Sequence, residues 1–156
     1  MPDYFPVADR IREDSKFFDV SLPQIDRDMD SEGGEVEYET EHYLDDIDGT
    51  EATIPLRLNL SCKSANVVGW TASLKLHGKR IDGIDWHARY RDKEGNWQSG
   101  WHRHDFDIGT RDDKFRIPVD GFDGIDRRVQ FIGHALRVMG ILLNEADHGS
   151  GELQFG

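Results

Sequence analysis

Apolar and polar residues alternate along several stretches between residues 35 and 119, a period of two that predicts half-buried β-strands. The stretches are 35–39, 54–60, 70–76, 84–91, 97–108 and 114–119. The run Asp92-Lys93-Glu94-Gly95 favours a turn, so the strands before and after it are expected to form a β-hairpin.

Beyond residue 119 the apolar positions take up a helical period. Ile125, Val129, Ile132, Leu136, Met139 and Leu143 are spaced three or four residues apart and form one apolar stripe. Asp123 is the expected N-cap of this helix. The predicted fold is α+β: an antiparallel β-meander of about five to six strands with a C-terminal amphipathic helix packed on one face.

The ends of the chain are expected to be less ordered than its centre. Three prolines and the run Ser31-Glu32-Gly33-Gly34 predict an acidic, partly disordered N-terminal arm over residues 1–34. Residues 35–148 are then a single α+β domain, and residues 149–156 a flexible tail.

The net charge of the 156 residues is −12, and all of this excess lies in residues 1–60, with 5 Lys/Arg against 17 Asp/Glu. Such acidity argues against a protein that coats DNA or binds anionic membranes, since both need a positive field. Two explanations of the acidity are open. The composition reflects adaptation to high salt or selection for solubility, or the acidic arm screens the mildly basic middle of the chain.

The remaining composition narrows the class of protein. No apolar run approaches the roughly 20 residues of a membrane span, and residues 1–4 lack the features of a secretory signal. The single cysteine, Cys62, excludes an internal disulfide and a cysteine-based zinc site. We therefore expect a cytoplasmic protein with no membrane association.

The predicted hairpin separates polar from apolar residues if Asp85 lies opposite His102. One face then carries Asp85, His87, Arg89, Arg91, His102 and His104. The other face carries Ile84, Trp86, Tyr90, Trp97 and Trp101 and is expected to pack against the helix. A slip of one residue would instead place both His102 and His104 among the aromatic side chains.

A His-X-His strand suits acid–base chemistry, because neutral imidazoles donate and accept protons near pH 7. His102 and His104 are the candidate acid–base pair of a ribonuclease that needs no metal, with His87 or Asp85 assisting. The candidate substrate-binding residues, which would clamp phosphate oxygens, are Arg89, Arg91 and Arg103.

The same histidines offer two other interpretations. His87, His102 and His104, completed by Asp105 or Asp107, could hold a divalent metal such as zinc or manganese. Alternatively, polar residues that alternate on the outer face of a sheet are ordinary solvated side chains, and the tryptophans beneath are core.

The order of short motifs also carries a resemblance over residues 75–143. It consists of Asp82-Gly83-Ile84-Asp85-Trp86, then Gly100-Trp101-His102-Arg103-His104, then Asp113-Lys114-Phe115, followed by the helix that contains Phe131-Ile132. This pattern is similar to a family of small prokaryotic proteins with a domain of unknown function, and more distantly to TumE-type toxins encoded beside a helix-turn-helix antitoxin. The resemblance implies that the characteristic histidines of the family fall on His102 and His104.

Three classes of function follow. The first is a toxin–antitoxin or defence protein that acts as a His-dependent ribonuclease, a hydrolase of phosphodiesters without a cofactor, with RNA or an antitoxin-like protein as its partner. The second is a non-catalytic protein-interaction module. The third is a metal-binding protein that uses the same histidines.

Overall fold

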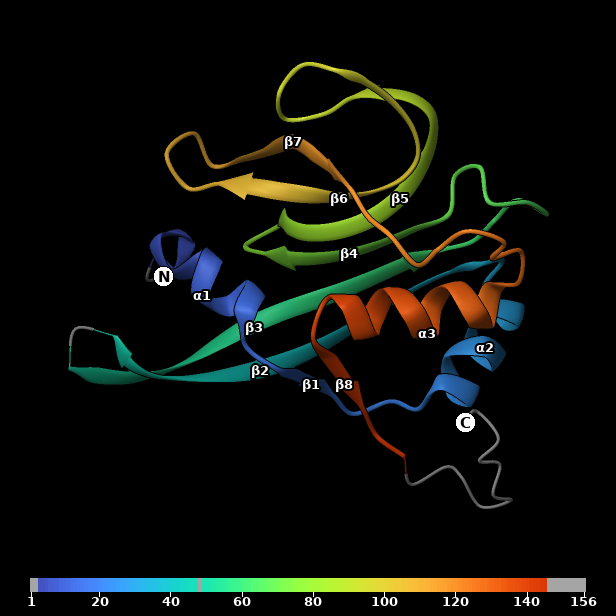
Figure 1. Ribbon diagram of the computed structural model, residues 1–156. Helices are drawn as coiled ribbons and strands as arrows, with labels where there is room; N and C mark the ends of the chain where they lie inside the picture. Colours follow the sequence, from blue (N-terminus) through green and yellow to red (C-terminus); the bar gives the residue numbers. More distant parts are fainter. Residues whose placement is uncertain (1–2, 48, 146–156) are drawn as a thin grey trace.

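The structure is a computed structural model that describes residues 3–47 and 49–145. The predicted tail at 149–156 lies outside the described residues. Figure 1 shows one curved sheet, with the three helices and a small second sheet packed beside it.

The sheet confirms the predicted antiparallel meander. Its strands are β2 (Glu35–Ile47), β3 (Thr50–Ser61), β4 (Thr71–Leu76), β5 (Lys79–Arg91), β6 (Trp97–Asp107) and β7 (Asp112–Pro118). They lie side by side in chain order, and every neighbouring pair is antiparallel. The α+β class with a C-terminal helix on one face is therefore confirmed.

The N-terminal segment corrects one prediction. Residues 3–34 are not a partly disordered arm but form a 3₁₀ turn η1 (Phe5–Val7), helix α1 (Ala8–Glu13), strand β1 (Lys16–Phe18) and helix α2 (Leu22–Ser31). Ser21 caps α2 by accepting a hydrogen bond from the Gln24 amide, and Pro23 lies in the first turn, where its missing N–H costs nothing. The segment therefore belongs to the folded domain.

The C-terminal helix is shorter than its apolar stripe predicts. Helix α3 (Arg128–Val138) begins after Arg127 rather than at Asp123. It ends before Gly140, whose φ of 72° is left-handed and which a side chain would crowd against the Asp14 carbonyl. Leu143 therefore lies in strand β8 (Ile141–Leu143), which pairs in parallel with β1.

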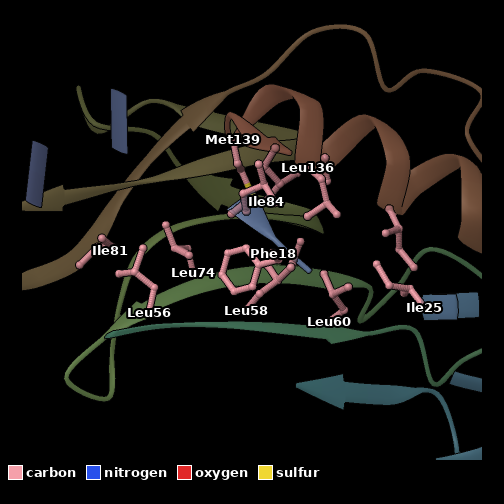
Figure 2. Close-up of a cluster of buried hydrophobic side chains, with 14 of the residues drawn as sticks. Phe18, Ile25, Leu56, Leu58, Leu60, Leu74, Ile81, Ile84, Leu136 and Met139 are labelled. Carbon is pink, nitrogen blue, oxygen red and sulfur yellow. The ribbon is translucent and has the colours of Figure 1, made fainter. Parts of the chain in front are cut away.

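The hydrophobic core lies between the sheet and the helices (Figure 2). Leu56, Leu58 and Leu60 alternate along β3 and point inward, where they meet side chains from α3 and from the N-terminal segment. Phe18 and Ile25 of that segment are fully buried, which explains why it is ordered.

None of the helices formed by the described residues has the length and the apolar composition needed to cross a membrane.

Candidate metal centre

At one end of the hairpin, strands β5 and β6 bring the polar residues together as the sequence predicts. Asp85 pairs with His102 directly across the two strands, which confirms the predicted register there. His104 lies two residues further along β6, so its side chain projects from the same face as that of His102.

The donor atoms of three side chains converge on one point. A carboxylate oxygen of Asp85 (Oδ1) lies 2.7 Å from His104 Nε2 and 3.3 Å from His102 Nε2. All three donor atoms lie within 4.8 Å of one another, a spacing that allows them to bind a single metal ion. We call Asp85, His102 and His104 the histidine–aspartate cluster.

The outer nitrogens of both imidazoles are fixed by backbone carbonyls. His102 Nδ1 donates to the Gly100 carbonyl at 3.3 Å, and His104 Nδ1 donates to the Asp113 carbonyl at 3.2 Å. A carbonyl only accepts hydrogen bonds, so each Nδ1 carries a proton. In a neutral ring, Nε2 is then a bare lone pair aimed at the Asp85 carboxylate, an arrangement that requires a cation or additional protons between them.

The histidine–aspartate cluster is almost completely removed from solvent. His102 and His104 are 0% and 1% exposed. They alternate with Trp101, which stacks on Phe131 of α3, so they lie on the face of the sheet away from that helix. Burial raises the pKa of Asp85, but hydrogen bonds from His102 and His104, which the rings donate when both of their nitrogens are protonated, outweigh it and hold that pKa well below the usual carboxyl range. The carboxylate is therefore ionised at neutral pH.

Two further residues, Arg80 of β5 and Asp113 of β7, support the cluster. Arg80 lies 3.7 Å from the second Asp85 oxygen, and its Nε donates to the Asp113 carboxylate. Asp113 in turn supplies the carbonyl that holds His104. The sequence analysis missed Arg80, because a one-residue shift in the β4–β5 pairing places it on this face.

His87 stands at the edge of the cluster. Its Nδ1 lies 3.3 Å from His102 Nε2, and the two rings stack with their centroids 4.9 Å apart. Burial lowers the pKa of His87 below its ordinary value, which favours the neutral, ligand-competent form. Unlike His102, His87 is exposed to solvent.

A β-bulge changes the far half of the hairpin and overturns part of the predicted face. Between His87 and Tyr90, β5 contains one more residue than the facing part of β6, so Tyr90 pairs with Gln98 instead of Trp97. Tyr90 consequently packs on His102, with ring centroids 4.2 Å apart. The sequence had placed Tyr90 with the residues that pack on the helix.

The same bulge moves the two arginines. Arg89 and Arg91 were expected beside the histidines, but their guanidinium groups lie 3.8 and 4.4 Å from the ring centroid of Trp97. Trp97, expected in the core, is 52% exposed beneath them. The prediction that three imidazoles and two guanidinium groups share one face is therefore wrong for the two arginines.

Three further candidates have other partners. Arg103, expected to bind phosphate, forms a forked ion pair with the buried Asp82 at 2.8 and 2.7 Å. Asp105 pairs with Arg12 and Lys93, because it alternates with His104 and faces the other side of β6. Asp107 accepts a hydrogen bond from Thr110. Asp85 is instead the carboxylate that meets the histidines.

Two buried polar atoms near the cluster have no hydrogen-bond partner among the described residues: the Tyr90 hydroxyl and Arg116 Nε. Tyr90 contacts the His102 ring, and Arg116 lies directly across from His104 on β7. The sequence had placed Tyr90 on the opposite face, and it gave no role to Arg116 because the strands that carry His104 and Arg116 were not paired.

No protein-family model, curated protein or solved structure matches this chain. The resemblance to the small prokaryotic family therefore stays a prediction, and the functional argument depends on the geometry of the site.

Proposed function

We propose that this protein binds a divalent metal ion through Asp85, His102 and His104, with His87 as the fourth ligand. The observation that carries the proposal is that the Nε2 atoms of His102 and His104 converge on one carboxylate oxygen of Asp85. At the same time, the Nδ1 protons of both rings are donated to backbone carbonyls. Second hydrogen bonds of this kind are the usual way in which proteins orient ligating imidazoles.

The donor set favours zinc. Four donors about 2.1 Å from a tetrahedral zinc ion lie roughly 3.4 Å apart. The separations His102–Asp85 and His87–His102 are both 3.3 Å, whereas the 2.7 Å contact of His104 with Asp85 would have to lengthen. His87 lies outside the group of donor atoms within 4.8 Å of one another, so its ring would also have to move closer to the other ligands. Imidazole and carboxylate ligands also suit manganese, iron and nickel, which are the competing ions.

The burial of the His102 and His104 rings favours a structural role for this ion. Closed four-ligand zinc sites hold protein segments together, whereas catalytic sites keep one position open for water or substrate. Here the ligands would join β5 to β6, and the Asp113 carbonyl would connect β7 to the same centre.

The test is equilibrium zinc binding to the metal-free protein, with elemental analysis of the protein as purified. We expect one zinc ion per chain, and a loss of affinity of at least about tenfold in Asp85→Asn, His102→Gln and His104→Gln. His87→Gln should lose less, because His87 is the ligand nearest solvent.

His134→Gln is the matched control, since His134 lies on α3 and its ring contacts Phe122 and Arg137. It should bind zinc like the wild type. Failure of the wild type to bind zinc, manganese, iron or nickel near one ion per chain would overturn the proposal, as would equal losses in the control.

The ribonuclease and the antitoxin-like partner remain predictions. With His102 and His104 at 0% and 1% exposure, these two rings offer a ribonucleotide no accessible surface in this conformation, so metal binding has the stronger support. An RNA degradation assay that compares the wild type with His102→Ala and His104→Ala tests the catalytic hypothesis. Equal activity of all three proteins would remove it.

A further inference from the structure

A cavity of about 430 Å³ lies where β5 and β6 meet the chain that connects β7 to α3 (the orange segment of Figure 1). Trp86 and Trp101 line it from the two strands, and Asp120 and Asp123 line it from the connecting chain. Val67 and Ile125 belong to its apolar wall. Neither the proposed metal centre nor the ribonuclease hypothesis uses this cavity.

The cavity is set apart by its charge. Its only charged side chains are Asp120 and Asp123, and neither forms a hydrogen bond or an ion pair with another described residue. The larger cavity beside β2 places Arg57 and Lys75 against its glutamates. The cavity beside α1 likewise combines three arginines with three carboxylates. Two unpaired carboxylates therefore give this cavity a negative field that a cationic ligand would neutralise.

Two tryptophans and several apolar side chains contribute to its walls, beside polar groups that include the two carboxylates. Trp86 and Trp101 are directly opposite each other across β5 and β6, and Trp101 stacks on Phe131 of α3 with ring centroids 5.1 Å apart. Gly100 lies beside Trp86: its φ of 103° disfavours a side chain, and an added Cβ would be in ordinary contact with Trp86 Nε1 at 3.9 Å.

We propose that this cavity binds an alkylated ammonium group, such as the trimethylammonium head of a small organic cation. Indole rings attract a cation that lies over the ring face, and quaternary ammonium is the cation most suited to aromatic walls. An unsubstituted ammonium is more strongly hydrated, and Val67 and Ile125 offer no acceptor in exchange for the water that it would lose against them. Asp120 and Asp123 supply the long-range attraction at the rim, where both are exposed.

The experiment is isothermal titration of the full chain with choline and with 3,3-dimethylbutan-1-ol, which has the same shape but carries carbon in place of the charged nitrogen. We expect saturable binding of choline and affinity for the neutral alcohol at least about tenfold weaker. Added salt should weaken the binding of choline. Equal binding of the two compounds, or no binding of choline, would overturn the proposal.

Variants then locate the site. Asp120→Asn combined with Asp123→Asn should weaken choline binding at least about tenfold, and Trp86→Leu should weaken it too. Asp126→Asn is the matched control: this exposed aspartate on the same connecting chain is not among the residues that line the cavity, so the affinity should not change. Unchanged binding in the double variant would contradict the assignment, and so would binding of glucose in preference to choline.

Discussion

Tyr90 shows how much a single residue depends on its local geometry. Its side chain is 5% exposed, and its hydroxyl has no hydrogen-bond partner among the described residues. Burial raises the pKa of this hydroxyl, so it stays protonated at neutral pH. A buried hydroxyl without a partner costs about 1–3 kcal/mol of stability, while the ring itself still contributes packing on His102.

We therefore predict that Tyr90→Phe leaves the metal-free protein equally stable or more stable by up to about 1 kcal/mol. The substitution keeps the aromatic contact and removes only the unsatisfied group. Urea denaturation of the two proteins measures the difference. A loss of stability well above 1 kcal/mol would show that the hydroxyl has a partner, and the description of this face would then be wrong.

At the same scale, residue identity predicted the histidine–aspartate cluster but not its neighbours. Asp85, His102 and His104 could be grouped because side chains alternate between the two faces along each strand, and the hairpin turn sets which residues lie opposite each other. The bulge after His87 leaves no mark in the sequence, so the positions of Arg89 and Arg91 could not be predicted. One extra residue is enough to reverse a face.

At the scale of elements, the junction of α1 and β1 contains a buried charge. Lys16 is fully buried, and its Nζ donates to the carbonyls of Ile11 and Arg12 at the end of α1. Burial lowers the pKa of Lys16 to about 8, although Asp82 opposes this. In the unfolded chain the pKa of a lysine returns to about 10.4.

The sign of the pH dependence follows from these two values. Below about pH 8 Lys16 is charged in both states, and between about pH 8 and 10.4 the unfolded chain binds more protons. The contribution of Lys16 to the free energy of unfolding should therefore rise with pH across this window, by up to about 3 kcal/mol.

We predict that Lys16→Met removes this rise. Denaturation of wild type and variant from about pH 7.5 to about pH 9.5 measures the difference between their free energies of unfolding. The free energy of unfolding of the wild type should increase relative to that of the variant as the pH increases, since neutral Lys16 no longer carries a buried charge. Parallel pH profiles would contradict the lowered pKa.

The elements that the sequence predicted well are those with a long, regular period. Strands β2 to β7 alternate over many residues and were found near their predicted positions, whereas α1 and β1 are six and three residues long. Short elements like these depend on packing against the rest of the protein for their stability. Leu143 fitted the helical stripe only by spacing, and Gly140 ends the helix before it.

At the scale of the whole molecule, a metal ion at the cluster would couple β5, β6 and β7. A ligand that binds only the folded state adds about 2.7 kcal/mol of stability at a concentration 100 times its Kd. For a domain of this size we expect zinc to raise the Tm by roughly 5 to 10 °C. Differential scanning calorimetry with and without zinc measures this shift.

A chelator should reverse this effect, and His102→Gln should abolish it. A shift of the same size in His102→Gln would place the stabilising ion elsewhere on this acidic chain, whose net charge of −12 attracts cations without a built site. The His134→Gln control should retain the full shift, because its ring lies on α3 against Phe122.

X-ray absorption spectroscopy of the zinc-loaded protein tests the metal centre most directly. The account predicts nitrogen and oxygen ligands at about 2.0–2.1 Å, with the outer-shell scattering of three imidazoles from His87, His102 and His104. A spectrum with oxygen ligands alone and no imidazole scattering, or with sulfur at about 2.3 Å, would contradict it.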